Sequence, residues 1–154
     1  MDDILQQIEQ EVAVFARRIE GARTRTYGTA QLDRSAYLLL LYLQQNGQCT
    51  QGEYAAAFEL DTSTVSRQIV PLVEMGLVER KLSPQDKRSS VLQITAQGIE
   101  KLQEVRQARR ELYEEVLEDW TPSEQGQFLY LLQRFNARLK ERAEARAAMR
   151  KGRP

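Results

Sequence analysis

A cluster of short hydroxyl and long polar side chains opens the segment 61–76. After Asp61, it consists of Ser63, Thr64, Ser66, Arg67 and Gln68. Short hydroxyl groups let a helix approach DNA closely, and arginine and glutamine can pair bidentately with guanine and adenine. Because a helix in the major groove presents its N-terminal turn to the bases, the cluster predicts a helix that reads DNA. The solvated face of an ordinary helix is the alternative interpretation.

A second candidate site lies in the polar segment 83–90, between two stretches of alternating hydrophobicity. We expect Arg88 in the minor groove of DNA, where negative potential is concentrated. Lys87 and Arg80 are expected to contact phosphates, as is Gln51 or Thr50 at the start of a short helix. The alternative is that Asp86 and Arg88 form an exposed ion pair in a β-turn, which contributes little.

The residue types that most enzymes and metal sites need are scarce in this chain. Its 154 residues include 22 basic and 22 acidic side chains, no histidine and one cysteine, Cys49. Histidine is a common ligand of zinc, copper and nickel and the usual acid–base group near neutral pH. The sequence also has no nucleophile–base arrangement and no phosphate-binding glycine loop, so we expect no catalytic residues, no metal and no cofactor. The neutral net charge means that any contact with nucleic acid must rest on local charge.

Hydrophobic periodicity and helix-end residues predict the elements that position these sites. We expect helices over about 1–20, 33–46, 50–60, 61–76, 95–119 and from 121 onward, a connection at 21–28, and a β-hairpin over 77–95. This order predicts a mainly α (α+β) fold, a winged helix-turn-helix with long N- and C-terminal dimerisation helices, about six helices and a β-hairpin wing. Pro71 is expected to bend the second half of the reading helix, our name for the helix at 61–76.

Residues typical of helix starts support this order. Thr50 with Glu53 fits a capping box, in which each side chain bonds to the backbone N–H of the other residue. Thr121 with Glu124 repeats that pattern, and Asp33 or Ser35 can cap the helix before the Asn46-Gly47 pair.

The two ends of the chain carry apolar stripes that the central elements cannot cover. We expect dimerisation through Leu5, Ile8, Val12, Phe15, Phe128, Leu132 and Phe135. A monomeric helical bundle is the alternative. The expected division is 1–32 for the N-terminal dimerisation helix and connection, 33–97 for the DNA-binding domain, and 98–154 for the C-terminal dimerisation helices and a basic tail. We expect the basic end, 146–153, to be frayed and solvated, and contact with DNA is the alternative. The longest apolar run, 37–43, is far shorter than the ~20 residues that span a bilayer, and no secretory signal opens the chain, so we expect a cytoplasmic protein.

Three segments in order resemble the MarR family of bacterial transcription regulators. They are DTSTVSR (61–67), LVEMGLVER (72–80), and DKR (86–88) followed by LQITAQG (92–98). The resemblance implies that Asp86 orients Arg88 without touching DNA itself. It also implies a homodimeric repressor on a palindromic operator, released when a small aromatic or phenolic acid binds between the dimerisation region and the winged domain.

Residues that could line such an effector cleft are aromatic or arginine side chains near the N-terminal helix: Tyr27, Tyr37, Arg17, Arg18, Arg23 and Arg25. Two alternatives to this function stay open. One is a winged domain that binds protein and not DNA. The other is a regulator that senses oxidants through Cys49, although no basic residue neighbours this thiol in the sequence.

Overall fold

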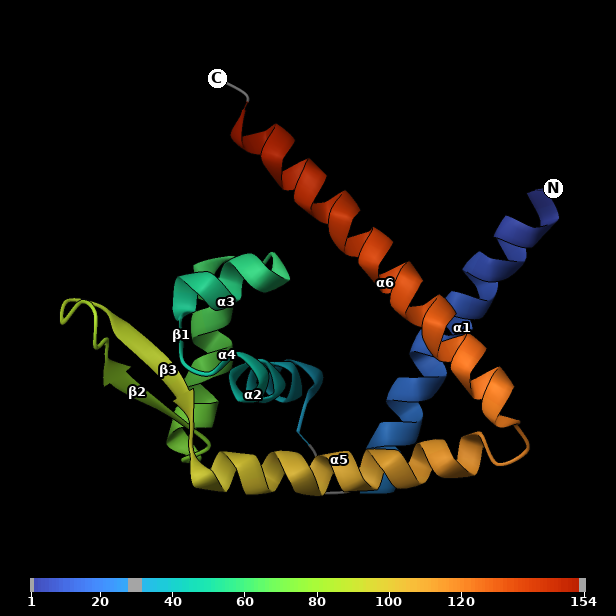
Figure 1. Ribbon diagram of the computed structural model, residues 1–154, viewed down its shortest axis with the longest axis horizontal. Helices are drawn as coiled ribbons and strands as arrows, with labels where there is room; N and C mark the ends of the chain where they lie inside the picture. The colour runs from blue at the N-terminus through green and yellow to red at the C-terminus, as the bar shows by residue number, and fades with distance from the viewer. Residues whose placement is uncertain (1, 28–31, 153–154) are drawn as a thin grey trace.

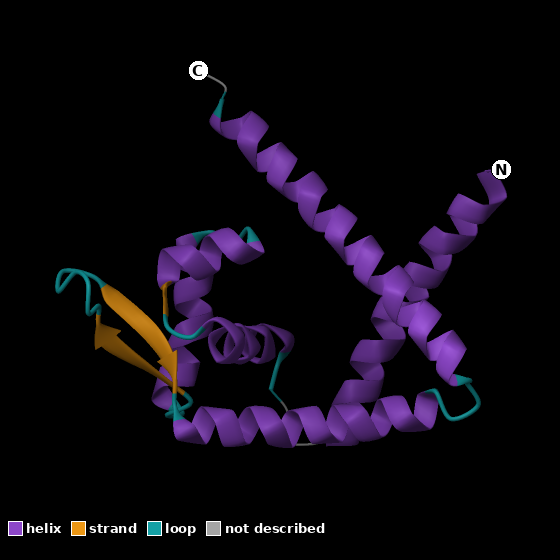
Figure 2. Cartoon of the chain, in the orientation of Figure 1, coloured by secondary structure: helices purple, strands orange, loops and turns teal. Residues whose placement is uncertain are grey.

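The computed structural model describes the backbone of residues 2–27 and 32–152, and side chains over 3–22, 32–150 and 152. In chain order the elements are α1 (Asp2–Tyr27), α2 (Arg34–Asn46), β1 (Cys49–Thr50), α3 (Gln51–Phe58), α4 (Thr62–Glu74), β2 (Val78–Leu82), β3 (Ser90–Ile94), α5 (Ala96–Val116) and α6 (Pro122–Lys151). The mainly helical winged helix-turn-helix fold, with six helices over the described residues and a hairpin wing, is therefore confirmed (Figures 1 and 2).

The hydrophobic core lies where α2, α3 and α4 meet the small sheet. Its largest fully buried side chains are Tyr54, Leu39, Leu40, Leu43, Ile69, Leu72, Leu92, Leu102, Val65 and Val78. Each leucine or isoleucine removed from water in this way contributes roughly 2 kcal/mol. Within α4 the buried residues are Val65, Ile69 and Leu72, which recur at helical spacing and fix which face of α4 turns outward.

The predicted helix starts are confirmed. The Asp33 carboxylate accepts the Ala36 N–H at 2.7 Å, and the reciprocal bonds of a capping box join Thr50 to Glu53 and Thr121 to Glu124. These bonds satisfy backbone N–H groups that a helix leaves without partners in its first turn. α4 continues through Pro71, which falls in its last turn, so any bend there lies beyond the polar N-terminal turns.

The sheet has one strand more than the sequence predicts. Its order is β1-β3-β2, and both pairs are antiparallel. The extra strand β1 pairs Cys49 with Leu92 and Thr50 with Val91. A strand of two residues is too short to show alternating hydrophobicity, so periodicity could not have indicated it.

Two predicted boundaries near the chain ends are wrong. α1 continues through 21–27, where the sequence predicts a connection, because no residue there prevents helix continuation. α6 continues to Lys151, in place of the expected frayed tail. Its alanines, glutamates and arginines favour helix over the whole segment.

α5 joins two parts of the molecule (Figure 1). The winged unit, α2 to β3, lies at the start of α5, whereas α1 and α6 project from the region of its other end. α5 contacts both α2 and α1. No helix in the described part of the chain is long and apolar enough to cross a membrane.

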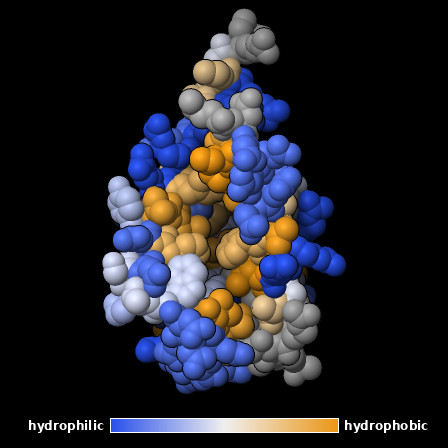
Figure 3. All heavy atoms as spheres, turned by 90° about the vertical axis from the view of Figure 1, so that its right-hand side faces the viewer, coloured by the Kyte–Doolittle hydropathy of each residue, from blue (hydrophilic) through white to orange (hydrophobic). Residues whose placement is uncertain are grey.

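The projecting helices expose large apolar side chains. On α1 they include Leu5, Ile8, Val12 and Phe15, and on α6 they include Phe128, Leu132, Phe135 and Leu139. Figure 3 shows hydrophobic side chains gathered on the face of the molecule formed by this end. The described chain therefore leaves uncovered an apolar surface of the kind that subunit interfaces use.

Gly98 marks the tightest backbone contact between α5 and the turn before the wing. A Cβ atom at Gly98 would lie 2.1 Å from the Leu77 carbonyl oxygen and 2.8 Å from Ile94 Cγ1. No side chain fits at such distances. The start of α5 can therefore approach the wing closely only because residue 98 is glycine.

We expect Gly98→Ala to lower the free energy of unfolding by roughly 1–3 kcal/mol, because the backbone must move away from Leu77. Gly126→Ala is the matched control, since a Cβ atom at this helical position meets nothing within 4 Å in the chain. It should raise stability by about 0.5–1 kcal/mol. Urea denaturation at equal protein concentration measures the free energy of unfolding of both variants and of the wild type. A Gly98→Ala variant as stable as the wild type would contradict the close contact at Gly98.

Candidate nucleic-acid interface and ligand cavity

The first turn of α4 is held by Asp61. Its carboxylate accepts hydrogen bonds from the Thr64 backbone N–H at 2.7 Å and from the Thr64 hydroxyl at 2.8 Å, and also from the Ser63 hydroxyl. The bond from Ser63, followed by those from Thr64, holds the pKa of Asp61 well below its usual range. Asp61 therefore stays ionised, and the Ser63 and Thr64 hydroxyl groups keep an oxygen lone pair that can accept a hydrogen bond from a ligand. The Thr64 hydroxyl also accepts one from the Arg67 guanidinium at 3.4 Å.

The outward face of α4 lies opposite its buried residues. Ser63, Arg67, Val70 and Glu74 recur there at helical spacing, and all four are exposed. Val70 is 47% exposed and is not among the predicted site residues. The signal was present, because Val70 lies three residues after Arg67 and is out of step with the buried series. Ser63 and Arg67 thus share one accessible face.

Gln51 and Ser66 contact each other at the junction of α3 and α4. The Gln51 side-chain amide donates to the Thr62 carbonyl at 2.8 Å and to the Ser66 hydroxyl at 2.6 Å. Both N–H bonds of this amide are thereby used within the protein. This geometry indicates that Gln51 positions the start of α4. It does not favour the phosphate contact predicted for Gln51.

Gln68 is less accessible than the residues of the outward face of α4. It is only partly exposed, and its Oε1 is buried without a hydrogen-bond partner among the described residues. It lines a cavity of about 230 Å³ between α4 and the start of α2. The sequence predicts that Gln68 contacts bases beside Arg67. Arg67 lines the same cavity and is exposed, whereas Gln68 is only partly exposed and its Oε1 is buried.

The wing places the other predicted cations at the surface. Arg80, Lys87 and Arg88 are not buried, the first on β2 and the other two at the hairpin tip. The tip is closed by a backbone bond from Ser83 to Ser89 at 2.9 Å. A second bond runs from the Asp86 N–H to the Ser83 hydroxyl at 3.3 Å.

Asp86 supports Arg88 through the backbone. Its carboxylate accepts the Arg88 N–H at 2.9 Å. The ion pairs formed within the described residues do not include one between these two side chains. Asp86 therefore shapes the turn that carries Arg88 and leaves the guanidinium group available to a ligand.

Cys49 is a buried residue of β1. Burial, with a smaller contribution from the charge of Glu53, raises the pKa of its thiol to about 11. Since the thiolate is the reactive form, this environment disfavours oxidation and alkylation near neutral pH. The structure gives no support to the alternative in which Cys49 senses oxidants.

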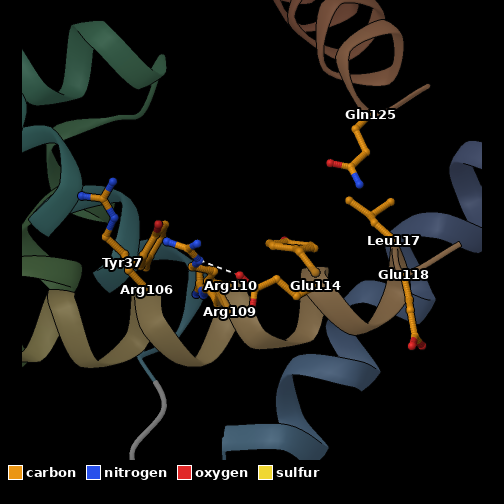
Figure 4. A pocket seen from close by; sticks show the side chains of 9 residues that line it. Tyr37, Arg106, Arg109, Arg110, Glu114, Leu117, Glu118 and Gln125 are labelled. Carbon is orange, nitrogen blue, oxygen red and sulfur yellow. Dashed lines mark hydrogen bonds and ion pairs between the residues drawn. The ribbon is translucent and has the colours of Figure 1, made fainter. Parts of the chain in front are cut away.

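A cavity of about 760 Å³ opens where α5 leaves the winged unit (Figure 4). Its lining residues are Tyr37, Arg106, Arg109, Arg110, Tyr113, Glu114, Leu117, Glu118 and Gln125. Tyr37 comes from α2, Gln125 from α6 and the remainder from α5 or the turn after it. The volume lies in the range of small-molecule sites, and aromatic and cationic side chains face it together.

Arg109 is the most unusual residue of this cavity, because it is charged and only 6% exposed. Its guanidinium carbon lies 3.5 Å from the centroid of the Tyr37 ring. Arg106 donates to Gln44 at 3.2 Å, and Arg110 pairs with Glu114 at 2.7 Å. A cation on an aromatic face, beside two further arginines, suits an aromatic anion.

Among the predicted cleft residues whose side chains the structure describes, one lines the cavity. Tyr37 does so, whereas Arg17 and Arg18 are not among its lining residues. The side chains of Tyr27, Arg23 and Arg25 lie outside the described ones. Arg109 is absent from the predicted set, although it follows Leu102 and Val105 at the spacing of the buried face of α5. An arginine at an inward position was the available signal.

The chain is similar in sequence to known transcription regulators. A family model described as MarR family matches residues 30–89. YxaD of Bacillus subtilis (strain 168), named as an uncharacterized HTH-type transcriptional regulator, is 40% identical over 129 residues, which are 84% of this chain and 90% of YxaD. The relative and this chain therefore correspond over almost their whole lengths.

Solved structures agree in fold. A substituted form of MarR from E. coli in complex with operator DNA is similar, with a TM-score of 0.70, 19% identity, and coverage of 84% of this chain and 93% of that one. BpsR of Bordetella bronchiseptica, whose structure concerns regulation of its DNA binding by 6-hydroxynicotinic acid, has a TM-score of 0.64 at 21% identity. That match covers 81% of this chain and 92% of BpsR.

Proposed function

We propose that this chain, which belongs to the MarR family of DNA-binding transcription regulators and is not an enzyme, is a homodimeric repressor of a palindromic operator. A small aromatic or phenolic acid releases it from DNA. The observation that carries the proposal is the outward face of α4, where Ser63 and Arg67 are exposed beside a wing that presents Arg88. Since bacterial operators lie in the cytoplasm, we expect the protein to act there.

In this proposal α4 enters the major groove. Arg67 reaches a guanine, and Ser63 with Thr64 accepts hydrogen bonds from the amino groups of bases, because both hydroxyls donate to Asp61. Val70, one turn further along the same face, packs against a thymine methyl group. Ser66 and Gln51 hold the start of the helix in place. Gln68, which is only partly exposed, contacts DNA from the edge of the outward face.

The wing supplies the second set of contacts. Arg88 enters the minor groove, while Lys87 and Arg80 neutralise phosphates. The protein as a whole has no net charge. The attraction to DNA must therefore come from local cations such as these. A dimer on a palindromic operator presents each of them twice, once at each half-site.

We expect Arg88→Ala to weaken binding to the selected operator by an order of magnitude or more without a large change in melting temperature, because Arg88 is exposed and its side chain makes no ion pair with another described residue. The operator is first obtained by selection from random duplex DNA, which should give a motif with twofold symmetry. Fluorescence anisotropy at several salt concentrations then measures the operator affinity of the wild type and of Arg88→Ala. Arg18→Ala on α1 is the control.

Wild-type binding should weaken steeply with salt, because each neutralised phosphate releases counterions. Binding that is absent or insensitive to salt would reject the proposal and favour a protein-interaction module. Equal affinities of wild type and Arg88→Ala would remove the wing from the interface.

Dimerisation is proposed from the uncovered stripes of α1 and α6. Leu5, Ile8, Val12 and Phe15 follow one seam of α1, and Phe128, Leu132 and Phe135 follow α6. All are exposed in the single chain, and a second copy would bury them. Two winged units related by a twofold axis read half-sites about one helical turn apart.

We expect Phe15→Asp to convert the dimer to monomer, because a carboxylate would have to be buried in the apolar seam. Gln10→Asp, a polar replacement outside that seam, should leave the dimer intact. Sedimentation velocity measures the mass of each, and circular dichroism checks that helix content is kept. A stable Phe15→Asp dimer would exclude this part of α1 from the interface.

The cavity at α5 is the proposed effector site. Arg106 and Arg110 would bind the carboxylate, and Tyr37 and Tyr113 would flank the ring. Because the cavity includes side chains from α2, α5 and α6, a ligand there can favour one spacing of the two winged units over another.

We expect benzoate and hydroxybenzoates to release the protein from its operator and benzamide, their neutral analogue, to have little effect. The double variant Arg106→Gln/Arg110→Gln should lose this response while it keeps DNA affinity, and Lys101→Gln on the same helix is the control. Titration of the protein–operator complex measures release. An equal response to acid and amide would show that the arginines do not select a carboxylate.

A further inference from the structure

The C-terminal half of α6 carries a row of arginines spaced four residues apart. The row consists of Arg134, Arg138, Arg142, Arg146 and Arg150. Because α6 is helical through Lys151, residues four apart are neighbours on its surface. Like charges at this spacing destabilise a helix, so the row has a cost for the isolated chain. Such an arrangement is better explained by an anionic partner than by the stability of α6.

The row is mostly unneutralised. Of its five arginines, only Arg138 makes an ion pair with another described residue, at 2.7 Å from Glu141. Segment 134–150 contains six basic and two acidic side chains, a net charge of +4, so the remainder of this neutral chain has a net charge of −4. Positive charge is therefore concentrated on one exposed helix.

The end of the row lies beside the approach to the reading helix. Arg146 and Arg150 line a cavity of about 710 Å³, together with Ala143, Ala147, Met149 and Glu59. Glu59 follows α3 directly and stands two residues before Asp61, the cap of α4. The fold thus brings two arginines, against one glutamate, to the turn that precedes α4, and in Figure 1 α6 runs back from the far end of α5 toward the side of α3.

We propose that Arg142, Arg146 and Arg150 bind the phosphate backbone of the operator duplex next to the reading helix. This inference rests on the proposed function. Guanidinium groups match phosphate oxygens with paired hydrogen bonds. The alanines between them are small, which lets the helix come close to a DNA strand. The contact supplies sequence-independent affinity to a protein whose net charge supplies none.

The test compares two double variants of the full-length protein. Arg146→Gln/Arg150→Gln removes two charges from the row in each subunit. Arg17→Gln/Arg18→Gln removes the same number from α1 and is the matched control. Glutamine keeps helix propensity and much of the side-chain length. Affinity for the selected operator is measured by fluorescence anisotropy from low to moderate salt, and sedimentation equilibrium gives the dimer dissociation constant of each protein.

We expect the row variant to bind DNA more weakly at low salt, with a log–log salt dependence that is shallower by about 0.9 for each phosphate that the variant no longer neutralises. The control variant should keep the wild-type slope. Equal slopes for the row variant and wild type would overturn the inference while leaving the proposed function intact. An unchanged slope with a weakened dimer would overturn it too, because the row would then bind the partner subunit. Wild-type protein without salt-dependent binding would instead reject the proposed function, and the inference with it.

Discussion

Burial of one face of α4 is the constraint on which the candidate interface depends. Val65, Ile69 and Leu72 are almost inaccessible to solvent, and together they fix the rotation of the helix about its axis. With that rotation set, Ser63 and Arg67 must point outward, since helical positions four apart share a face. The polar residues of α4 need no further device to aim them, only a cap and a fixed start, which Asp61 and Gln51 provide.

Charged side chains of this protein can attract a polyanion only where they cluster, because the formal net charge of the chain is zero. Cations stand at the wing tip and along the end of α6, while the rest of the chain carries compensating acidic residues. Such a distribution favours a defined orientation on a polyanion over general attraction to it. The buried Arg109 differs in kind, because its guanidinium group lies on the Tyr37 ring and lines the cavity proposed as the effector site, not the outer surface.

α5 gives the proposed regulation a physical route. The helix begins against the wing, at the close contact of Gly98 with Leu77, and extends to the turn before α6. The cavity lies along its middle and second half. A ligand that changes how α2 and α6 sit on α5 would therefore change the distance between two winged units in a dimer, with no change inside either unit.

Features that depend on near neighbours in the chain could be predicted from the amino-acid sequence. The caps at Asp33, Thr50 and Thr121, the hairpin and the polar start of α4 belong to this group, because helix ends and turns are decided by residues within a few positions. Other features appear only in the folded chain, among them the pairing of β1 with β3, the use of the Gln51 amide inside the protein, and the burial of the Gln68 Oε1 atom. The burial of Arg109 under Tyr37 and the approach of Arg146 to Glu59 are of the same kind. Most of these contacts join residues far apart in sequence, and their partners are known only once the helices have packed.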